Sequence, residues 1–193
     1  MKIGIVSDTH GYFDSRLTSL LAGVDRILHA GDVGSRPVLD ELESIAPAHA
    51  VRGNVDPPEL GLPPRRVMAL DGLQVEMLHI LPAPQTQVEA WTMVNYSADK
   101  AGAGSRERFL RNFDPATRVV IFGHTHQPAL FEIKRTLFVN PGSAGKKRFS
   151  LPRCCALMQI SGREGEIKLL SLEGYNEKVI GSIRFKWECR RHA

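Results

Sequence analysis

The sequence predicts an α/β fold in which two mixed β-sheets pack together and helices flank them. Two observations support this prediction. In the first half of the chain, short apolar runs alternate with amphipathic segments, which is the pattern of βαβ units around a parallel sheet. In the second half, apolar runs come in pairs separated by short polar turns, which is the pattern of antiparallel hairpins. The 193 residues, of which 42% are hydrophobic, are expected to form a single domain, 1–193, that ends in a basic extension at 174–193.

The first half contains three predicted strands joined by two predicted helices. The strands are residues 3–6, 26–30 and 48–52. Residues 14–21 carry leucines at the three-and-four spacing of a helix that packs on a sheet, and Gly23 ends that helix. Ser35 is the expected N-cap of the second helix, with Pro37 in its first turn and apolar residues continuing to Ile45. This alternation predicts that the early strands are parallel.

Three hairpins are predicted in the second half. Their paired segments are 66–70 with 73–77, 130–133 with 137–139, and 156–160 with 167–172 across a loop at 162–165. The first of them turns at Asp71-Gly72, which is a favoured two-residue hairpin turn. The β-branched run 119–122 is expected to be a buried strand.

The stretch 82–113 contains a predicted helix and a segment without a clear pattern. The helix is expected at 106–113, where Asp114-Pro115 stops it. Upstream, within 82–108, Trp91 and Tyr96 either form a lid over a bound substrate or pack a surface loop onto the body of the protein.

The C-terminal tail combines a strand pattern with positive charge. Apolar side chains alternate with charged ones from Ile183 to Trp187, so the tail is expected to pair with a sheet edge of its own chain or of a neighbouring copy. Residues 178–193 hold five basic residues against Glu188 alone, which accounts for the whole net charge of +4. The rest of the chain is electrically balanced, which argues against nucleic acid as a partner.

Composition also bears on the compartment. The chain opens directly into a predicted strand, and it holds no apolar run of about 18 residues. The protein is therefore expected to be cytoplasmic, without a membrane partner. Cys154-Cys155 and Cys189 form neither a disulfide framework nor a CxxC zinc site, and they are expected to be small core residues and one thiol in the tail.

Seven polar side chains follow the predicted strands directly. They are Asp8, His10, Asp32, Asn54, His79, His124 and His126. Residues two apart in an extended chain face the same side, and ligands bind beyond the carboxyl ends of parallel strands, so these side chains are expected to converge. Carboxylate, amide and imidazole donors suit Mn²⁺, Fe²⁺ or Zn²⁺. Seven donors exceed what one ion needs, and two ions can share them if one carboxylate bridges.

These residues stand in motifs whose order is that of a known family. The motifs are Asp8-x-His10, Gly31-Asp32, Gly53-Asn54, His79, Gly123-His124-x-His126 and Asn140-Pro141-Gly142-Ser143. With them the chain resembles the calcineurin-like metallophosphoesterases, in particular their small single-domain phosphodiesterase branch. The resemblance covers roughly the first five-sixths of the chain and implies a four-layer α/β/β/α fold.

The resemblance also implies an activity and a set of roles. It implies hydrolysis of a small phosphoester, in particular a phosphodiester, by a hydroxide bound to two divalent transition metals, manganese first, with iron, zinc or nickel as alternatives. Asp8, His10 and His126 would hold the first metal, Asn54, His79 and His124 the second, and Asp32 would bridge them. Asp32, Asn54 and His124 would thereby act in catalysis through the metals. Asn54, Gly142 and Ser143 would contact the substrate, although a structural turn explains the Pro-Gly sequence equally well.

Several positions leave alternatives open. His29 could orient a metal ligand or could be a satisfied core histidine. Residues 146–148, all basic, could steer an anionic substrate or form a solvated turn. Relatives can carry histidines where this chain has Val55 and Leu81, so the general acid is unassigned. That gap keeps a second function open, a catalytically weak or inactive scaffold of the same fold that binds proteins. A homo-oligomer is also left open.

Overall fold

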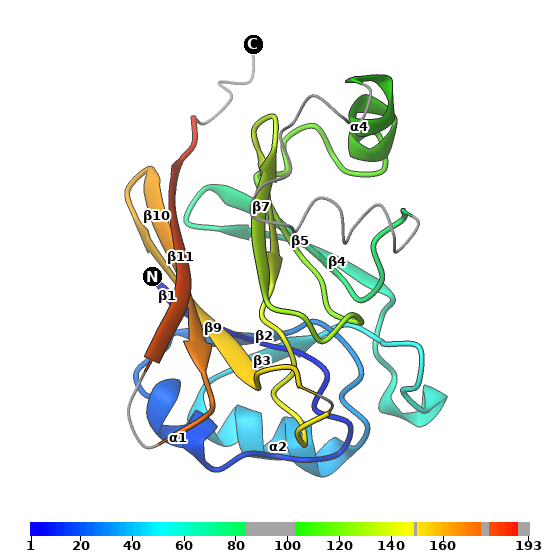
Figure 1. The fold of residues 1–193 in the computed structure, drawn as a ribbon, viewed down its shortest axis with the longest axis vertical. Helices are drawn as coiled ribbons and strands as arrows, with labels where there is room; N and C mark the ends of the chain where they lie inside the picture. Colours follow the sequence, from blue (N-terminus) through cyan, green and yellow to red (C-terminus); the bar gives the residue numbers. More distant parts are fainter. Residues whose placement is uncertain (84–102, 149, 175–177, 189–193) are drawn as a thin grey trace.

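A computed structural model of the chain shows two β-sheets packed face to face (Figure 1). The structure describes residues 1–83, 103–148, 150–174 and 178–188. Sheet A has the strand order β11-β10-β9-β1-β2-β3, and sheet B has the order β4-β5-β6-β8-β7. Both sheets contain parallel and antiparallel pairs. The predicted α/β class with two mixed sheets is confirmed.

Sheet A joins the two halves of the chain. Its strands are β1 (Lys2–Val6), β2 (Arg26–His29), β3 (Ala48–Ala50), β9 (Cys154–Ser161), β10 (Glu164–Ser171) and β11 (Lys178–Lys186). The first three are parallel, as predicted, and are connected through α1 (Arg16–Leu20) and α2 (Arg36–Ile45). The β9-β10 hairpin then adds antiparallel to the other side of β1. Ser35 occupies the N-cap of α2, as expected, but its side chain makes no capping hydrogen bond.

Sheet B is built around two hairpins and a parallel centre. Its strands are β4 (Arg65–Leu70), β5 (Leu73–Leu78), β6 (Val119–Ile121), β7 (Ala129–Ile133) and β8 (Thr136–Asn140). Asp71 and Gly72 turn the β4-β5 hairpin with φ of 47° and 79°, as a two-residue primed turn requires. The strands β5, β6 and β8 are parallel, so their carboxyl ends lie at one edge.

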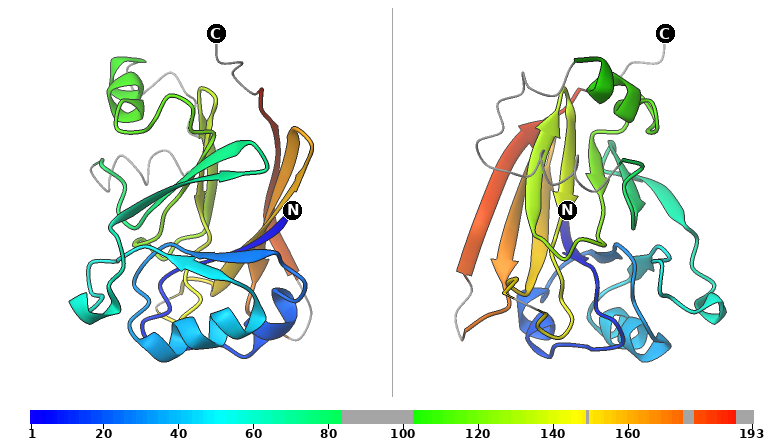
Figure 2. Two further views of the ribbon diagram at one scale, coloured as in Figure 1. Left: turned by 180° about the vertical axis from the view of Figure 1, so that it is seen from behind. Right: turned by 45° about the vertical axis from the view of Figure 1, so that its right-hand side comes forward.

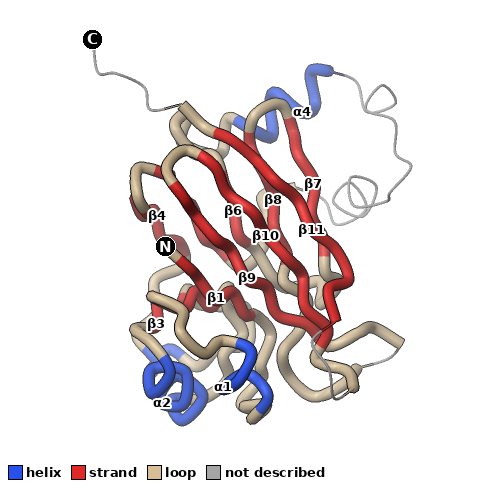
Figure 3. Tube along the Cα trace, turned by 90° about the vertical axis from the view of Figure 1, so that its left-hand side faces the viewer, coloured by secondary structure: helices blue, strands red, loops and turns tan. Residues whose placement is uncertain are grey.

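Successive side chains along the strands point to opposite faces of each sheet, so they enter two different apolar layers. Ile3 and Ile5 of β1 point into the core between the sheets, where they join Val119 and Ile121 of β6. Figure 3 shows strands of sheet A lying in front of strands of sheet B around this core. Residues of the opposite parity face outward and are covered by helices, as Val120 is on sheet B. The alternation therefore gives each sheet an outer face, and helices cover part of it.

The helices complete the outer layers. Side chains of α1 and α2 form an apolar cluster with the outer face of sheet A. On sheet B, Phe109 of α4 (Ala103–Leu110) and Phe113 pack against Phe138. Figure 2 shows α1 and α2 together at one end of the molecule and α4 at the other. In the described part of the chain, no helix is long and apolar enough to cross a membrane.

Some predicted boundaries were wrong. The helix expected at 106–113 lies at Ala103–Leu110, because the amides of Asn112 and Phe113 bond to carbonyls three residues back and tighten the chain into turns. The loop expected at 162–165 is shorter, since β10 already begins at Glu164. A 3₁₀ helix, η1 (Pro58–Leu60), had no predicted counterpart. The predictions for Trp91, Tyr96 and Cys189 lie outside the described residues.

The tail forms an edge strand of its own chain, which confirms the predicted pairing. The strand β11 runs antiparallel to β10, with Ile183 opposite Ile167 and Phe185 opposite Gly165. The Phe185 ring lies over Gly165, where an added Cβ would approach it to 2.3 Å. Trp187 is only 3% exposed and belongs to the core between the sheets.

Truncation after Asn176 should therefore lower stability without abolishing the site chemistry. Loss of a buried aromatic side chain alone costs about 3–5 kcal/mol, and the edge of β10 would also be exposed. Thermal unfolding and light scattering of the truncated chain would show the effect, with a chain ending at Glu188 as the control. Equal melting temperatures and sizes would mean that β11 contributes nothing to the fold.

Candidate metal centre

The carboxyl ends of parallel strands from both sheets meet at one place. Asp8 and His10 follow β1, Asp32 follows β2, and His124 and His126 follow β6. All five have positive φ, between 48° and 70°. Asp and His tolerate this left-handed region better than most residues, and such strained positions cluster at functional sites. Among the described non-glycine residues, the only others with positive φ are Asp71 and Lys134 in hairpin turns.

One group of side chains gathers around Asp8. The Nε2 atoms of His10 and His126 lie 3.2 Å apart. The Asp8 Oδ1 atom lies 3.4 Å from His126 Nε2 and 4.0 Å from His10 Nε2. Three donor atoms of the types that bind divalent metals therefore converge in one small volume.

A second group gathers around Asn54. Its Oδ1 atom lies 3.1 Å from His79 Nε2 and 3.0 Å from His124 Nδ1. Asp32 lies between the two groups, because its Oδ2 atom is 3.2 Å from His79 Nε2 and 3.8 Å from His10 Nε2. Asp8 is also close enough to Asp32 and His79 to share a metal with them. The structure thus brings all seven predicted side chains together.

Hydrogen bonds across the two sheets fix these side chains. His79 follows a strand of sheet B, and its Nδ1 lies 2.8 Å from the Ala30 carbonyl oxygen of sheet A. A carbonyl only accepts, so Nδ1 carries a proton. Burial acts to lower the pKa of His79, but the hydrogen bond from Nε2 to Asp32 raises it, and a metal bound at Nε2 would displace that second proton. In the other direction, the His124 amide donates to both oxygens of the Asp8 carboxylate at 3.2 Å. Such contacts orient metal ligands before any metal binds.

Three glycines let the loops approach this closely. A Cβ at Gly53 would lie 2.0 Å from Asp32 Oδ1 and 2.2 Å from the Asp32 amide nitrogen. A Cβ at Gly31 would lie 2.7 Å from the His79 ring, and one at Gly123 would lie 2.8 Å from Asp8 Oδ2. At these three positions, which directly precede candidate ligands, a side chain would clash with neighbouring atoms, so only glycine fits.

The two carboxylates differ in their protonation. Burial raises the pKa of Asp8 to about 6, although the charge of His79 acts in the opposite sense. Burial also acts to raise the pKa of Asp32, but hydrogen bonds from His79 and the Val55 amide lower it to about 2. Among the described residues, no lysine or arginine forms an ion pair with either carboxylate.

The imidazoles of the Asp8 group are held neutral. Burial and the charge of Arg148 lower the pKa of His10, and burial together with His10 lowers that of His126 to about 4. Neutral imidazoles are the form that binds metals. Lone-pair atoms that face one another beside buried carboxylates lack a positive partner, which a divalent cation would supply. The donor set therefore fits the metals that the sequence predicts.

His29 is a satisfied core histidine. It is fully buried, its Nδ1 accepts from the Gly31 amide at 3.2 Å, and its Nε2 lies 2.9 Å from Thr9 Oγ1. Burial lowers its pKa to about 4. It holds together the loops that carry Asp8 and Asp32 without touching either side chain in a hydrogen bond. Both ring nitrogens are engaged, so the structure gives it no part in proton donation.

The loop at 140–143 makes structural hydrogen bonds. The Asn140 side chain donates to the Gly123 carbonyl and accepts from the Gly142 amide, both at 2.9 Å. The buried Ser143 hydroxyl donates to the Asp8 carbonyl at 2.9 Å and accepts from Gly145. These contacts support the structural-turn alternative for Gly142 and Ser143, because both polar groups are already used within the fold.

In the basic turn at 146–148, the two lysines fit the structural alternative, and Arg148 fits the alternative in which the turn steers an anionic substrate. Lys146 lies over the Tyr12 ring at 5.9 Å, and Lys147 pairs with Glu173 at 3.3 Å. Arg148 has no ion-pair partner among the described residues, and its charge acts on His10 and His126. Arg148 is therefore the member of the turn whose position suits an anionic substrate.

Two buried aspartates had no predicted role. Asp56 accepts from the Gly34 amide at 2.7 Å and from the Gly53 amide at 2.8 Å, so it joins the loops that carry Asp32 and Asn54. Asp14 accepts from Arg16 and from Arg153 at 2.6 and 2.7 Å. The only sequence signal for Asp56 is that an acidic residue stands two positions after Asn54. That position does not reveal which amides Asp56 binds.

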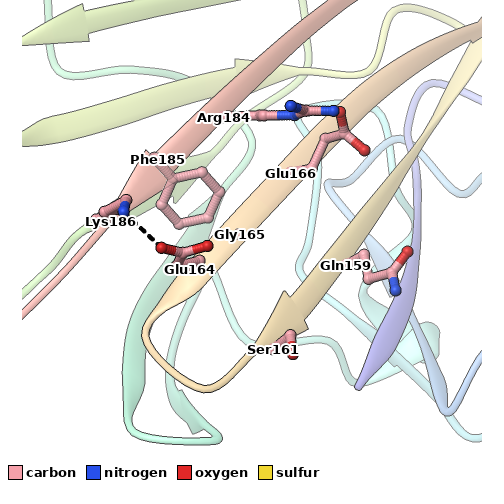
Figure 4. A pocket seen from close by; sticks show the side chains of 8 residues that line it. All are labelled: Gln159, Ser161, Glu164, Gly165, Glu166, Arg184, Phe185 and Lys186. Atoms are coloured by element: carbon pink, nitrogen blue, oxygen red, sulfur yellow. Dashed lines mark hydrogen bonds and ion pairs between the residues drawn. The ribbon is translucent and has the colours of Figure 1, made fainter.

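A separate hollow of about 590 Å³ lies on strands β9 to β11 (Figure 4). Its charged residues neutralise one another, since Glu164 pairs with Lys186 at 2.5 Å and Glu166 with Arg184 at 3.0 Å. Neither of the two groups of described residues that could hold a metal includes a residue of this hollow. The candidate metal ligands of the described residues lie at the strand-end site, outside this hollow.

Known proteins share this sequence pattern and this fold. Residues 1–163 match the calcineurin-like phosphoesterase superfamily domain. A probable metallophosphoesterase of Methanothermobacter thermautotrophicus is 30% identical over 179 residues, which are 88% of this chain and 92% of the relative. YfcE, a phosphoesterase from E. coli, has a TM-score of 0.63 at 18% identity, covering 95% of this chain and 98% of its own. Vps29 of Chaetomium thermophilum, in complex with a cyclic peptide, has a TM-score of 0.70 at 20% identity, covering 96% and 97%.

Proposed function

The chain belongs to the calcineurin-like phosphoesterase superfamily, and from that premise we propose that it hydrolyses phosphodiesters at a site that holds two divalent transition metals. The family and the candidate ligands fit a metal-dependent phosphoesterase. The dinuclear site, the preference for diesters and the choice of manganese are the specific parts of the proposal.

The position of Asp32 supports a site for two metals. Its Oδ2 atom lies between His10 of the first group and His79 of the second. Seven donors around one shared carboxylate exceed the coordination of a single ion. Asp8, His10 and His126 would hold one metal and Asn54, His79 and His124 the other, with Asp32 common to both.

The residues of the chain supply orientation and charge. Two such metals would activate a water molecule and neutralise the charge that develops on the phosphoryl group. His79 stays in the required tautomer through its bond to Ala30, and Asp8 is held by the His124 amide. Arg148 adds a positive charge at the rim, which favours an anionic substrate.

The test combines metal content with turnover. We expect the reconstituted full-length protein to bind two metals per chain and to hydrolyse a bis-aryl phosphodiester with Mn²⁺. Metal analysis after dialysis gives the stoichiometry, and release of the phenol gives the rate. One metal or fewer at saturation would contradict the dinuclear proposal, whereas two metals without turnover would contradict the enzymatic one.

The rate should depend steeply on the leaving group. Val55 and Leu81 are apolar, both nitrogens of His29 are engaged, and we assign no general acid among the described residues. General acid assistance contributes typically ~10²–10⁴-fold, so aryl and phosphate leaving groups should react well and alkyl groups slowly. A series of phosphodiesters with graded leaving-group pKa, at fixed metal and pH, measures this dependence. A flat series with rate-limiting chemistry would reveal an acid that we have not assigned.

A protein-binding scaffold is the second candidate function. A structural neighbour, Vps29, is seen with a bound cyclic peptide, and this chain exposes Val55 and Ile80 beside the site, at 56% and 47%. Retention of all seven predicted donors favours the enzyme. Metal binding without hydrolysis of any phosphoester in the graded series would favour the scaffold.

A further inference from the structure

A groove of about 260 Å³ opens beside the Asn54 group, and its lining residues other than Asn54 and His79 have no role in the proposed hydrolysis. It is lined by Arg52, Gly53, Asn54, Pro64, Arg65, Leu78, His79 and Ile80. The groove is smaller than the roughly 300–1,000 Å³ typical of sites for drug-sized ligands. It can therefore take part of a substrate whose phosphoryl group lies at Asn54 and His79.

The two arginines that line the groove differ in whether their charge is already paired. Arg65 forms an ion pair with the buried Glu76 and donates to the Asn112 carbonyl at 2.8 Å, so its charge is neutralised. The Arg52 side chain is exposed and has no hydrogen bond or ion pair among the described residues. Its backbone is fixed, because the Arg52 amide donates to the Pro63 carbonyl at 2.8 Å. The groove thus holds a guanidinium on an ordered loop, two residues before a candidate metal ligand.

The walls of the groove favour an apolar part of a ligand next to the charge that Arg52 would bind. Leu78, Pro64 and Ile80 are apolar, and Ile80 is 47% exposed although it directly follows His79. A planar guanidinium binds carboxylate and phosphate groups through paired hydrogen bonds, and the apolar walls would cover the carbon atoms next to such an anion. The lining therefore suits an organic group that ends in a negative charge.

We propose that this groove is a subsite for a second anionic group of the substrate, a carboxylate or a phosphate, bound by Arg52 with its attached apolar part against Ile80. The proposal rests on the proposed function, since it places the reacting phosphoryl group at the metal site. It assigns the substrate to phosphoesters that carry a further negative charge on one arm.

Binding of unreactive probes tests the subsite without turnover. The probes are phenylphosphonate, 4-carboxyphenylphosphonate and 1,4-benzenediphosphonate, titrated calorimetrically into the Mn²⁺-loaded full-length protein. A second charge would gain a charge-assisted hydrogen bond to Arg52, so a probe that carries one should bind at least ~10-fold more tightly than phenylphosphonate. The two charged probes separate carboxylate from phosphate recognition.

Four variants make the test specific. Arg52→Gln should abolish the preference for the charged probes and change phenylphosphonate affinity less than about 3-fold, whereas Arg52→Lys should retain part of it. Arg36→Gln removes an equal charge from the exposed face of α2 and should keep the full preference. Arg148→Gln should weaken all three probes alike.

The outcomes separate the subsite from the proposed function. Equal affinity of the wild-type protein for all probes, or an unchanged preference in Arg52→Gln, would overturn the subsite. A preference that depends on Arg52, in a protein that hydrolyses no phosphoester, would support the subsite and count against the enzyme.

Discussion

Replacing Asp32 with asparagine should weaken both proposed metal sites together and lower the proposed phosphodiesterase activity by at least about 100-fold. The carboxylate lies between the two groups of donors, so its loss removes charge from both at once. Each tenfold loss of rate corresponds to about 1.4 kcal/mol, and loss of a shared anionic ligand is expected to cost a multiple of that value. Titration of the metal-free variant with Mn²⁺, read by calorimetry, gives the two affinities.

His10→Ala is the matched comparison for Asp32. Its ring contacts Asp8, His126 and Asp32 but lies in the first group only, so this variant should weaken chiefly one metal. Asp8→Asn tests the other carboxylate that is close to both groups. If Asp32→Asn keeps two metals at unchanged affinity while Asp8→Asn loses both, the bridging role belongs to Asp8.

Gly53→Ala should be nearly as damaging as loss of a ligand, although it removes no donor atom. The added methyl group would lie 2.0 Å from Asp32 Oδ1 and 2.2 Å from the Asp32 amide nitrogen, and a backbone atom cannot turn away as a flexible side chain can. The loops of Asp32 and Asn54 must separate. Overpacking of this kind typically costs about 1–3 kcal/mol, and the displaced carboxylate should also weaken metal binding at least ~10-fold.

Gly181→Ala is the matched control for Gly53→Ala. It makes the same chemical change in β11, where the new methyl group would lie 3.4 Å from Leu169, an ordinary contact distance. Its melting temperature and metal affinity should stay near those of the wild-type protein. Unchanged metal affinity in Gly53→Ala would show that the loops can shift without moving Asp32.

Elements whose signals are local were predictable from the sequence. The βαβ units and the hairpin at Asp71-Gly72 depend on periodicity and turn chemistry within a few residues, and the structure confirms them. The place of the β9-β10 hairpin beside β1, and of β8 between β6 and β7, depends on pairings between distant segments. Local patterns do not encode those neighbours, because any half-buried strand can pair with several others.

In the candidate site, too, local sequence signals identified some residues, whereas others act through contacts with distant segments. The seven donors could be identified because each follows an apolar strand, and parallel strand ends meet at one edge. The roles of Asp56 and Gly53 depend instead on groups about 20 residues away, with which they make a hydrogen bond or a close approach. Arg52 is one of 25 basic residues, and only its place in the groove distinguishes it.

The hydrogen bonds from His79 to Ala30 and from His124 to Asp8 join the two sheets at the candidate metal site. A metal bound there would link the two sheets. At a free metal concentration of 100 times the dissociation constant, binding would add about 2.7 kcal/mol to the free energy of unfolding. Cellular metal supply would then set the lifetime of the protein as well as its activity. Chains starved of metal would open more often at this edge and be removed sooner by proteases.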